Sequence, residues 1–393
     1  MTLSRVQVSL LGLGAAVLLA SQNIDTRAQA QTAASNAQRT TTGNPITGEG
    51  LPNPAPVVIR NWGQLLPAGR KWGTTAGIDV DPIDGNIWAY ERCGAGAAGG
   101  AGGGPVNCDN NPVDPVFKFD RKTGAVLANF GKGIMVTPHG IGLDKDGNVW
   151  IADFAGNQAG TKGHQVHKFS PKGEKLMSLG VAGKASNADG EFNQPNDVVI
   201  GPDGSIYVSD GHEGQGMTTA NAVADGIKRG ATARISKFSP DGKFIKSWGG
   251  LGVRHGEFRT PHAMVFDGRG RLWVADRGNH RIEIFDQNGT YLESRYMFGR
   301  ISGLFIKGDT VYAIDSESGP YNHGNWRNGV RIGPVDEDRV TGFIPPFERS
   351  DRVYQGAAGE GVAVDAEGNV YAAEGPNSFV QAGGAFTKYS VGR

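Results

Sequence analysis

Short runs of alternating apolar and polar residues, bounded by turn residues, recur along most of this chain. Two of them almost repeat each other: residues 137–144 and 260–267 both begin Thr-Pro-His, and both continue into Gly-x-apolar-Trp-apolar-Ala-Asp. Four more copies in the same register begin near Ala76, Asn196, Gly303 and Glu360. Each copy is a β-branched or aromatic run, a turn of the Asp-Gly-Asn type and a second run, which predicts a β-hairpin.

The spacing of the copies predicts how the hairpins are arranged. The six copies lie about 40 to 65 residues apart, which is the period of propeller blades. A third and a fourth strand are predicted after most copies, for example at 164–169 with 174–179, and at 234–238 with 244–248. The chain also has 62 glycines, which suits a fold made largely of tight turns. We therefore expect an all-β fold, a six-bladed β-propeller with four-stranded antiparallel blades around a central channel.

The two ends of the repeat region are expected to meet. The last copy stops after 385–389, one strand short of a full blade, and the run Val57–Arg60 is suited to supply the missing edge strand. Closing the ring in this way removes two exposed sheet edges. The propeller is therefore predicted to span residues 56–393 as a single domain.

The first residues are predicted to lie outside the fold. Arg5 precedes an apolar run from Val6 to Ala20, and Ala28-Gln29-Ala30 has the pattern of a signal-peptidase site. Residues 1–30 are therefore predicted to be a secretory signal, with an uncleaved membrane anchor as the alternative. The Thr/Asn/Gly/Pro-rich residues 31–55 are predicted to be a disordered polar tail.

A secretory signal implies a secreted or periplasmic protein, and this changes the interpretation of the two cysteines. In an oxidising compartment, Cys93 and Cys108 at the ends of a glycine-rich loop favour a disulfide over a metal site. The formal net charge is zero and no cluster of basic residues stands out, which argues against nucleic acid or anionic membranes as partners. We expect a monomer that takes a small-molecule or peptide substrate in its channel.

The candidate chemistry lies on the first strand of each blade, because these strands line the channel and equivalent positions form a ring. That ring position holds Ala76, His139, Asn196, His262, a small residue near Ser302 or Gly303, and Glu360. His139, His262 and Glu360 fall on alternate blades and so lie a third of a turn apart. Two imidazoles and a carboxylate with an open position suit a divalent metal, zinc first and calcium as the alternative. A histidine that binds only water or a carbonyl is the plainer interpretation of each.

The chain resembles the NHL-repeat propeller of the lyases that cleave peptidyl-α-hydroxyglycine to a peptide amide and glyoxylate. The resemblance rests on Pro138–Gly140, Gln194–Asp197, Val208–Gly211, Phe238–Phe244, Gly256–His262 and Val274–Arg277. Most of these segments are shared by NHL propellers in general. The two Pro-His elements are more specific, because the lyase family has zinc histidines there.

The resemblance also implies roles for other residues. Arg92 falls where the family has a substrate-binding arginine, with a rim salt bridge as the alternative. Three positions depart from the family: Glu360 replaces the third zinc histidine, His212 replaces a catalytic tyrosine, and Gly361 replaces a calcium-binding aspartate. His212 is then expected to move the proton. Asn196 and Asp197 are expected to orient the substrate, although Asp197 equally suits a hydrogen bond to neighbouring backbone.

Two other classes of function remain open at this stage. One is a non-catalytic propeller that binds a ligand or protein on the face formed by the insertions Gly94–Pro115, Glu213–Thr232 and Ser316–Arg331. The other is a calcium-dependent lactonase of the gluconolactonase type, for which Glu360 and Asn196 would supply oxygen ligands. The ligand set separates the lactonase from the zinc-type lyase, because histidines favour a zinc-like ion and oxygen atoms favour calcium.

Overall fold

The computed structural model describes residues 43–60, 62–63, 73–94, 106–319, 323–346, 359–373 and 386–392. The chain divides into two compact units, Met1–Gly43 and Asn44–Arg393, and the second holds every element described below. The expected signal, 1–30, lies outside the described residues. Within the described ranges, no helix is both long enough and apolar enough to cross a bilayer.

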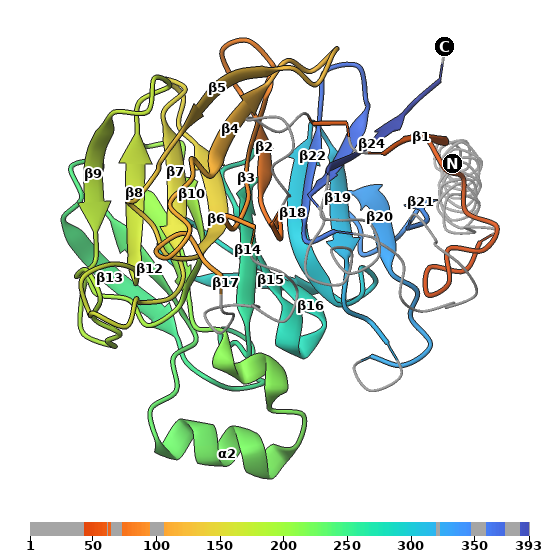
Figure 1. Ribbon diagram of the computed structural model, residues 1–393. Coiled ribbons are helices and arrows are strands. Elements are labelled where there is room, and N and C mark those ends of the chain that lie inside the picture. The colour runs from red at the N-terminus through yellow and green to blue at the C-terminus, as the bar shows by residue number, and fades with distance from the viewer. Residues whose placement is uncertain are drawn as a thin grey trace, which may run out of the picture. The chain divides into compact units, whose positions relative to one another are not determined.

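The described strands form six sheets of four antiparallel strands each (Figure 1), numbered here as blades in chain order. Blade one is β2 (Ile78–Val80), β3 (Ile87–Tyr90), β4 (Val116–Phe119) and β5 (Val126–Phe130). Blade two is β6 (Pro138–Leu143), β7 (Val149–Asp153), β8 (Gln165–Phe169) and β9 (Lys175–Leu179). Blade three is β10 (Pro195–Ile200), β11 (Ile206–Asp210), β12 (Arg234–Phe238) and β13 (Phe244–Gly249). Blade four is β14 (Pro261–Phe266), β15 (Leu272–Asp276), β16 (Arg281–Phe285) and β17 (Tyr291–Arg295).

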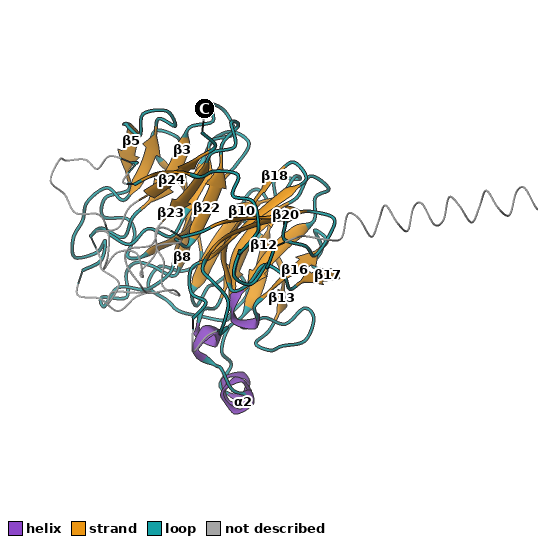
Figure 2. Cartoon of the chain, turned by 90° about the vertical axis from the view of Figure 1, so that its right-hand side faces the viewer, coloured by secondary structure: helices purple, strands orange, loops and turns teal. Residues whose placement is uncertain are grey.

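Blade five is β18 (Ile301–Lys307), β19 (Thr310–Asp315), β20 (Gly329–Pro334) and β21 (Gly342–Ile344). Blade six is β22 (Gly361–Val364), β23 (Val370–Ala373), β24 (Phe386–Ser390) and β1 (Val57–Ile59). Figure 2 shows how little helix accompanies these strands. The described helical segments are η2 (Glu213–Gly216), α2 (Ala220–Lys228) and η3 (Arg277–Asn279).

The first strands of the blades form a closed ring. Each of β2, β6, β10, β14, β18 and β22 contacts the first strand of the next blade, and β22 contacts β2. The predicted six-bladed β-propeller is therefore confirmed. The N-terminal strand β1 completes the last blade and so joins the two ends of the chain. It pairs antiparallel with β24, with Val57 opposite Ser390 and Ile59 opposite Lys388. This pairing confirms that Val57–Ile59 supplies the last edge strand.

The segment expected to be a disordered tail differs from the prediction in its described part, residues 43–55. Ala55 is fully buried, and the Pro52 carbonyl accepts a hydrogen bond of 3.0 Å from the backbone N–H of Phe343. The buried Arg331 donates from Nε to the Pro45 carbonyl at 2.8 Å. These residues are ordered because their backbone carbonyls satisfy donors of blade five. The compact unit accordingly begins at Asn44 and not at residue 56.

The Trp and Asp residues of the repeat explain why each hairpin forms. In three blades an aspartate at the end of the first strand accepts a hydrogen bond from the indole Nε1 of the next strand's tryptophan: the pairs are Asp81–Trp88 at 2.8 Å, Asp144–Trp150 at 3.4 Å and Asp267–Trp273 at 3.0 Å. The three tryptophans are at most 2% exposed. The hydrophobic clusters combine residues of neighbouring blades, so the core lies between the blades.

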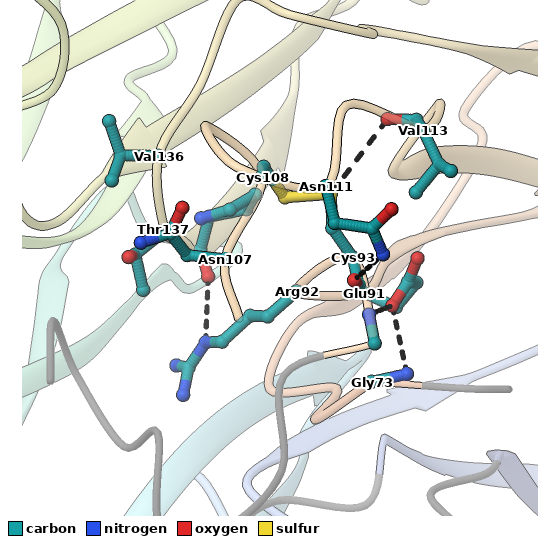
Figure 3. Close-up of a disulfide and its surroundings, with 12 residues drawn as sticks. Gly73, Glu91, Arg92, Cys93, Asn107, Cys108, Asn111, Val113, Val136 and Thr137 are labelled. Atoms are coloured by element: carbon teal, nitrogen blue, oxygen red, sulfur yellow. Dashed lines mark hydrogen bonds between the residues drawn. A yellow bond between two sulfur atoms is a disulfide. The ribbon is translucent and has the colours of Figure 1, made fainter. Parts of the chain in front are cut away.

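A disulfide joins Cys93 and Cys108, as predicted, in the long connection between β3 and β4. Figure 3 shows it beside Glu91 and Arg92. Three further hydrogen bonds anchor this connection. The Cys108 N–H donates to the Val136 carbonyl at 3.0 Å, and one Glu91 carboxylate oxygen accepts from the N–H groups of Gly73 and Gly94 at 2.8 and 2.9 Å. The disulfide thereby restrains the residue that follows Arg92.

Replacing both cysteines by serine is expected to lower the free energy of unfolding by about 2–3 kcal/mol, because the unfolded chain regains the entropy of an open loop. The two cysteines are 15 residues apart in sequence. Chemical denaturation of the wild-type protein and the variant, each with and without a reductant, measures the difference. Reductant should shift the wild-type midpoint alone. An equal midpoint for the two oxidised proteins would contradict the expectation.

Candidate active site

Four of the channel-facing side chains are aimed inward by a bulge at the start of the first strand of their blade. In β6, β10, β14 and β18 the pairing with the second strand skips one residue, and the skipped residues are His139, Asn196, His262 and Ser302. A β-bulge re-aims the side chain of its unpaired residue. With Ala76 and Glu360, these four side chains line one cavity of about 120 Å³ on the axis. The ring predicted from the repeat is therefore present.

The aspartates that end the second strands hold the approaches to the histidines. One Asp153 oxygen accepts from the Thr137 N–H at 2.7 Å, and one Asp276 oxygen accepts from the N–H groups of Arg259 and Thr260 at 2.9 and 3.3 Å. Each aspartate thus fixes the backbone two to three residues before a channel histidine. This explains why the Ala-Asp end of the repeat accompanies the Pro-His element.

Three histidines converge in this part of the channel. His139 and His262 come from the ring, whereas His212 lies two residues after β11, in the connection that contains η2. Their ring centroids lie 5.0 to 5.4 Å apart, and one nitrogen of each lies within 4.8 Å of the others. Among the described residues, these three are the group of metal-binding side chains close enough to share an ion.

Backbone carbonyls fix the orientation of two of these imidazoles. His139 Nδ1 lies 2.9 Å from the Asn196 carbonyl oxygen, and His262 Nδ1 lies 2.6 Å from the Ser302 carbonyl oxygen. Because a carbonyl only accepts, each Nδ1 carries the proton and each Nε2 keeps its lone pair. His262 Nε2 is buried and has no hydrogen-bond partner among the described residues. An imidazole held by an Nδ1–H···O=C bond is a common arrangement for a metal ligand.

The environment keeps the three imidazoles neutral. Burial is the largest cause that lowers the pKa of all three well below the ordinary value for histidine. The next cause is a nearby arginine, Arg92 for His139 and Arg277 for His212 and His262. A neutral imidazole is the form that binds a metal ion.

Phe154 packs against the histidines and has no role that the repeat pattern reveals. Its ring stacks on His139 with centroids 4.9 Å apart and meets His212 edge-on at 5.2 Å. Phe154 is 1% exposed. It therefore excludes water from one side of the histidine group and limits the rotation of both imidazoles.

Glu360 lies in the channel as expected, but its side chain pairs with an arginine and not with an imidazole. Glu360 Oε1 is 3.5 Å from Arg277 Nη1. The other terminal nitrogen of Arg277 lies 2.9 Å from His212 Nε2 and also donates to Gln215 Oε1. Burial raises the pKa of Glu360, and Arg277 and then Arg92 oppose that rise. The geometry thus exchanges two expected places: His212 joins the histidine group, and Glu360 joins an arginine.

Arg92 is 2% exposed and reaches the site from the disulfide-bonded connection. Its Nε donates to the Pro138 carbonyl at 3.0 Å, while its Nη2 has no acceptor among the described residues. The neighbouring Tyr90 hydroxyl donates to the His139 carbonyl. Arg92 and Tyr90 therefore hold the two backbone carbonyls that flank His139 Cα. Arg92 keeps its Nη2 donor for a ligand.

Asn196 and Asp197 hold blades together in this structure. Asn196 Nδ2 donates to the Gly211 carbonyl at 2.9 Å and to the Pro261 carbonyl at 3.0 Å, which fixes the residues before His212 and His262. Asp197 Oδ2 accepts from the Met264 N–H at 2.8 Å, and burial raises the pKa of Asp197 to about 8. Asn196 Oδ1 is buried without a partner in the described ranges.

Arg277, Arg300 and Glu317 are not among the site residues expected from the sequence. Arg277 belongs to the Val-Ala-Asp-Arg segment, whose likeness to other propellers suggested a role in the fold alone. Arg300 and Glu317 flank the degraded fifth copy of the repeat. Arg277 and Arg300 are at most 2% exposed. The signal in the sequence was an arginine directly after β15 and another directly before β18. A charge at the end of a predicted buried strand requires a partner, so each position could have been examined as part of the site.

Taken together, the side chains suit a divalent transition-metal ion beside an anion. The Nε2 lone pairs of His139 and His262 suit such an ion. His212 lies close enough to complete the group, but its Nε2 accepts from Arg277 in this structure, so it can bind an ion only when that contact opens. Arg92 and Arg277 lie beside these histidines and can bind a carboxylate or a developing oxyanion. Imidazoles do not provide the oxygen-rich shell that calcium prefers.

Known proteins share parts of this sequence. An NHL-repeat family model matches residues 258–285, which cover β14 to β16. The chain is 30% identical over 268 residues to peptidyl-glycine alpha-amidating monooxygenase B of Xenopus laevis, a match covering 65% of this chain and 27% of that protein. It is 24% identical over 288 residues to peptidyl-alpha-hydroxyglycine alpha-amidating lyase 2 of Drosophila melanogaster, covering 67% and 61%. It is 31% identical over 221 residues to human NHL repeat-containing protein 3, covering 55% and 53%.

The match therefore spans about a quarter of the length of the amidating monooxygenase. The resemblance to NHL-repeat propellers and to amidating lyases is confirmed. The name of the human relative states a repeat and no activity.

Proposed function

We propose that this NHL-type propeller, similar to amidating lyases, is a metal-dependent lyase that cleaves peptidyl-α-hydroxyglycine to a peptide amide and glyoxylate. The observation that carries the proposal is the convergence of His139, His212 and His262 in a buried channel. We assign the metal to these three residues, and we assign Glu360 to the chemistry beside it. Zinc is the ion that we propose, because neutral imidazole nitrogens are ligands that suit it.

When bound, the metal would supply a Lewis acid that polarises a substrate oxygen. The protein residues would do the rest. Arg277 binds the glycine carboxylate, Arg92 offers its unused Nη2 to the developing oxyanion, and Phe154 keeps water from the histidine side. In the reaction the bond between the amide nitrogen and the α-carbon breaks, the hydroxyl loses its proton as the aldehyde forms, and the amide nitrogen gains a proton.

Glu360 is the group that we propose to carry this proton. It is 4% exposed and lies beside Arg277, and burial raises its pKa towards the range in which a carboxyl group both accepts and returns a proton. This assignment replaces His212, which is better placed to hold the metal. The disulfide supports a protein that works in a secreted or periplasmic compartment, and we propose that it acts there as a monomer.

The assignment is tested with the full chain and a synthetic peptide that ends in α-hydroxyglycine. The purified protein is expected to contain about one equivalent of zinc and to release glyoxylate. Chelation should lower the rate at least about a hundredfold, and added zinc should restore it. The metal is measured by mass spectrometry and glyoxylate by a colorimetric assay.

Two results would contradict different parts of the proposal. Bound zinc without glyoxylate release would reject the lyase activity and leave the metal centre standing. Glyoxylate release that is indifferent to chelation in a metal-free protein would reject the metal centre. Calcium as the sole bound ion would favour the lactonase class.

A further inference from the structure

Two buried arginines and two glutamates meet beside the histidine group, and one of the glutamates is more exposed to water than the other three residues. Arg277, Arg300 and Glu360 are 0%, 2% and 4% exposed, whereas the Glu317 side chain is 22% exposed. Glu317 lies two residues after β19, and Arg300 lies immediately before β18. Glu317 is therefore the one member of this group that faces water to an appreciable extent.

Glu317 bridges the two arginines with long contacts. Its Oε2 is 3.2 Å from Arg300 Nη2, and its Oε1 is 3.7 Å from Arg277 Nη1. The second distance exceeds that of a hydrogen bond, so charge holds this oxygen and direction does not. By contrast, the two arginines are tied to each other, because Arg300 Nη1 donates to the Arg277 carbonyl at 3.1 Å. Arg300 therefore has an anchor besides Glu317, whereas one of the two Glu317 oxygens is held by charge alone.

The arginines also keep unused donors. The Nε atoms of Arg277 and Arg300 are buried and have no hydrogen-bond partner in the described part of the chain. Leaving a buried charged donor unsatisfied is costly, so a site with two such groups is suited to receive a ligand that accepts from them. A planar carboxylate matches the fork of a guanidinium group.

We propose that Glu317 is a displaceable internal counter-ion that occupies a carboxylate-binding subsite made by Arg277 and Arg300. A ligand carboxylate takes its place, and the Glu317 side chain then turns towards the water that it already contacts. This inference rests on the proposed function for the identity of the substrate. The subsite itself is a property of these three residues and is measurable without any turnover.

Removing the Glu317 charge changes the affinity for a carboxylate in opposite directions for a displaceable counter-ion and for a residue that only supports the arginines. If Glu317 competes with the ligand, its removal frees the arginines and binding becomes tighter. If Glu317 only orients the arginines, its removal disorders them and binding becomes weaker. Glu317→Gln keeps the size of the side chain and removes the charge, so it separates these two cases.

The experiment measures the affinity of the chelator-treated full chain for acetate, from the rise in its melting temperature with acetate concentration. Acetamide, which has the same shape without the charge, is the neutral probe. Glu317→Gln is expected to lower the Kd for acetate about tenfold relative to the wild type and to leave acetamide without effect. Glu213→Gln is the matched control, because Glu213 pairs on the surface with Arg229, and it should leave the Kd unchanged.

An acetate Kd that is unchanged or higher in Glu317→Gln would overturn the proposal and leave Glu317 as an orienting residue. If Glu317→Gln does not fold, Glu317→Asp gives the same test, because the shorter carboxylate cannot reach both arginines. A Kd for acetate that does not fall in Glu317→Asp would again overturn the proposal. Failure of the lyase assay with tighter acetate binding in the variant would reject the activity and keep the subsite. The reverse pair of results would reject the subsite and keep the activity.

Discussion

Replacing His139 and His262 together by alanine is expected to remove the metal from the channel and to lower kcat/KM at least about a thousandfold, or about 4 kcal/mol of transition-state stabilisation. These two imidazoles are the ones whose Nε2 lone pairs are set by the carbonyls of Asn196 and Ser302. One remaining histidine cannot hold an ion that needs three protein ligands. Metal content by mass spectrometry and glyoxylate release from the α-hydroxyglycine peptide measure the two losses.

The control for this variant is His255→Ala. His255 is 55% exposed on the side chain and lies in the connection between β13 and β14, beside Glu283 and Tyr291. It should keep both metal and activity. Circular dichroism establishes that the double variant is folded. A folded double variant with its full equivalent of metal would place the metal elsewhere and contradict the assignment.

The same assay separates the two roles considered for His212. Its Nε2 is 2.9 Å from Arg277 Nη2, and the imidazole lies within the histidine group. Loss of metal in His212→Ala is the expected result, because the group then has two members. Full metal content with lost turnover would instead return His212 to the proton-transfer role that the sequence suggested.

Replacing Gly140 by valine is expected to lower the free energy of unfolding by more than about 3 kcal/mol, since inner strands of neighbouring blades touch through their backbones at this residue. A Cβ atom on Gly140 would lie 2.4 Å from the Asn196 carbonyl oxygen and 2.5 Å from the Asp197 Cα. Both distances are far below contact distance, and neither partner is a flexible side chain. Blades two and three would have to separate.

The damage should reach the site as well, because the obstructed Asn196 carbonyl is the one that orients His139. We therefore expect weaker metal binding in Gly140→Val in addition to a lower denaturation midpoint. Gly268→Val is the matched control, since a Cβ there meets open space. Equal midpoints for the two variants would show that the inner strands can move apart, which would contradict the close packing described here.

The blades could be predicted because their interactions are local. Asp144 and Trp150 lie six residues apart and belong to one hairpin, and the same is true of Asp267 and Trp273. The repeated motif therefore records contacts within a blade, and it is visible in every copy that keeps these residues. The position of His139 and His262 in the ring follows from the repeat for the same reason.

The exchange between His212 and Glu360 could not be predicted in this way. His212 lies in the connection between β11 and β12, and the corresponding connections of other blades carry different side chains, such as Phe154 in blade two and Arg277 in blade four. Arg277 and Glu360 are 83 residues apart and come from blades four and six, with blade five between them in sequence. Alignment to a ring position assigns a side chain to the channel, but it does not assign the neighbour that the side chain meets there.

By itself, the sequence determined the number of blades, their strand pattern, the closing strand Val57–Ile59, the disulfide and the inward place of two histidines. All of these depend on the period of the repeat or on residue types close together in the chain. Only the tertiary structure decided that His212 completes the histidine group, that Glu360 pairs with Arg277, and that Glu317 bridges two buried arginines. The reason is physical: a buried charge takes whichever partner the closed ring brings within reach, and that choice is made between blades and not along the chain.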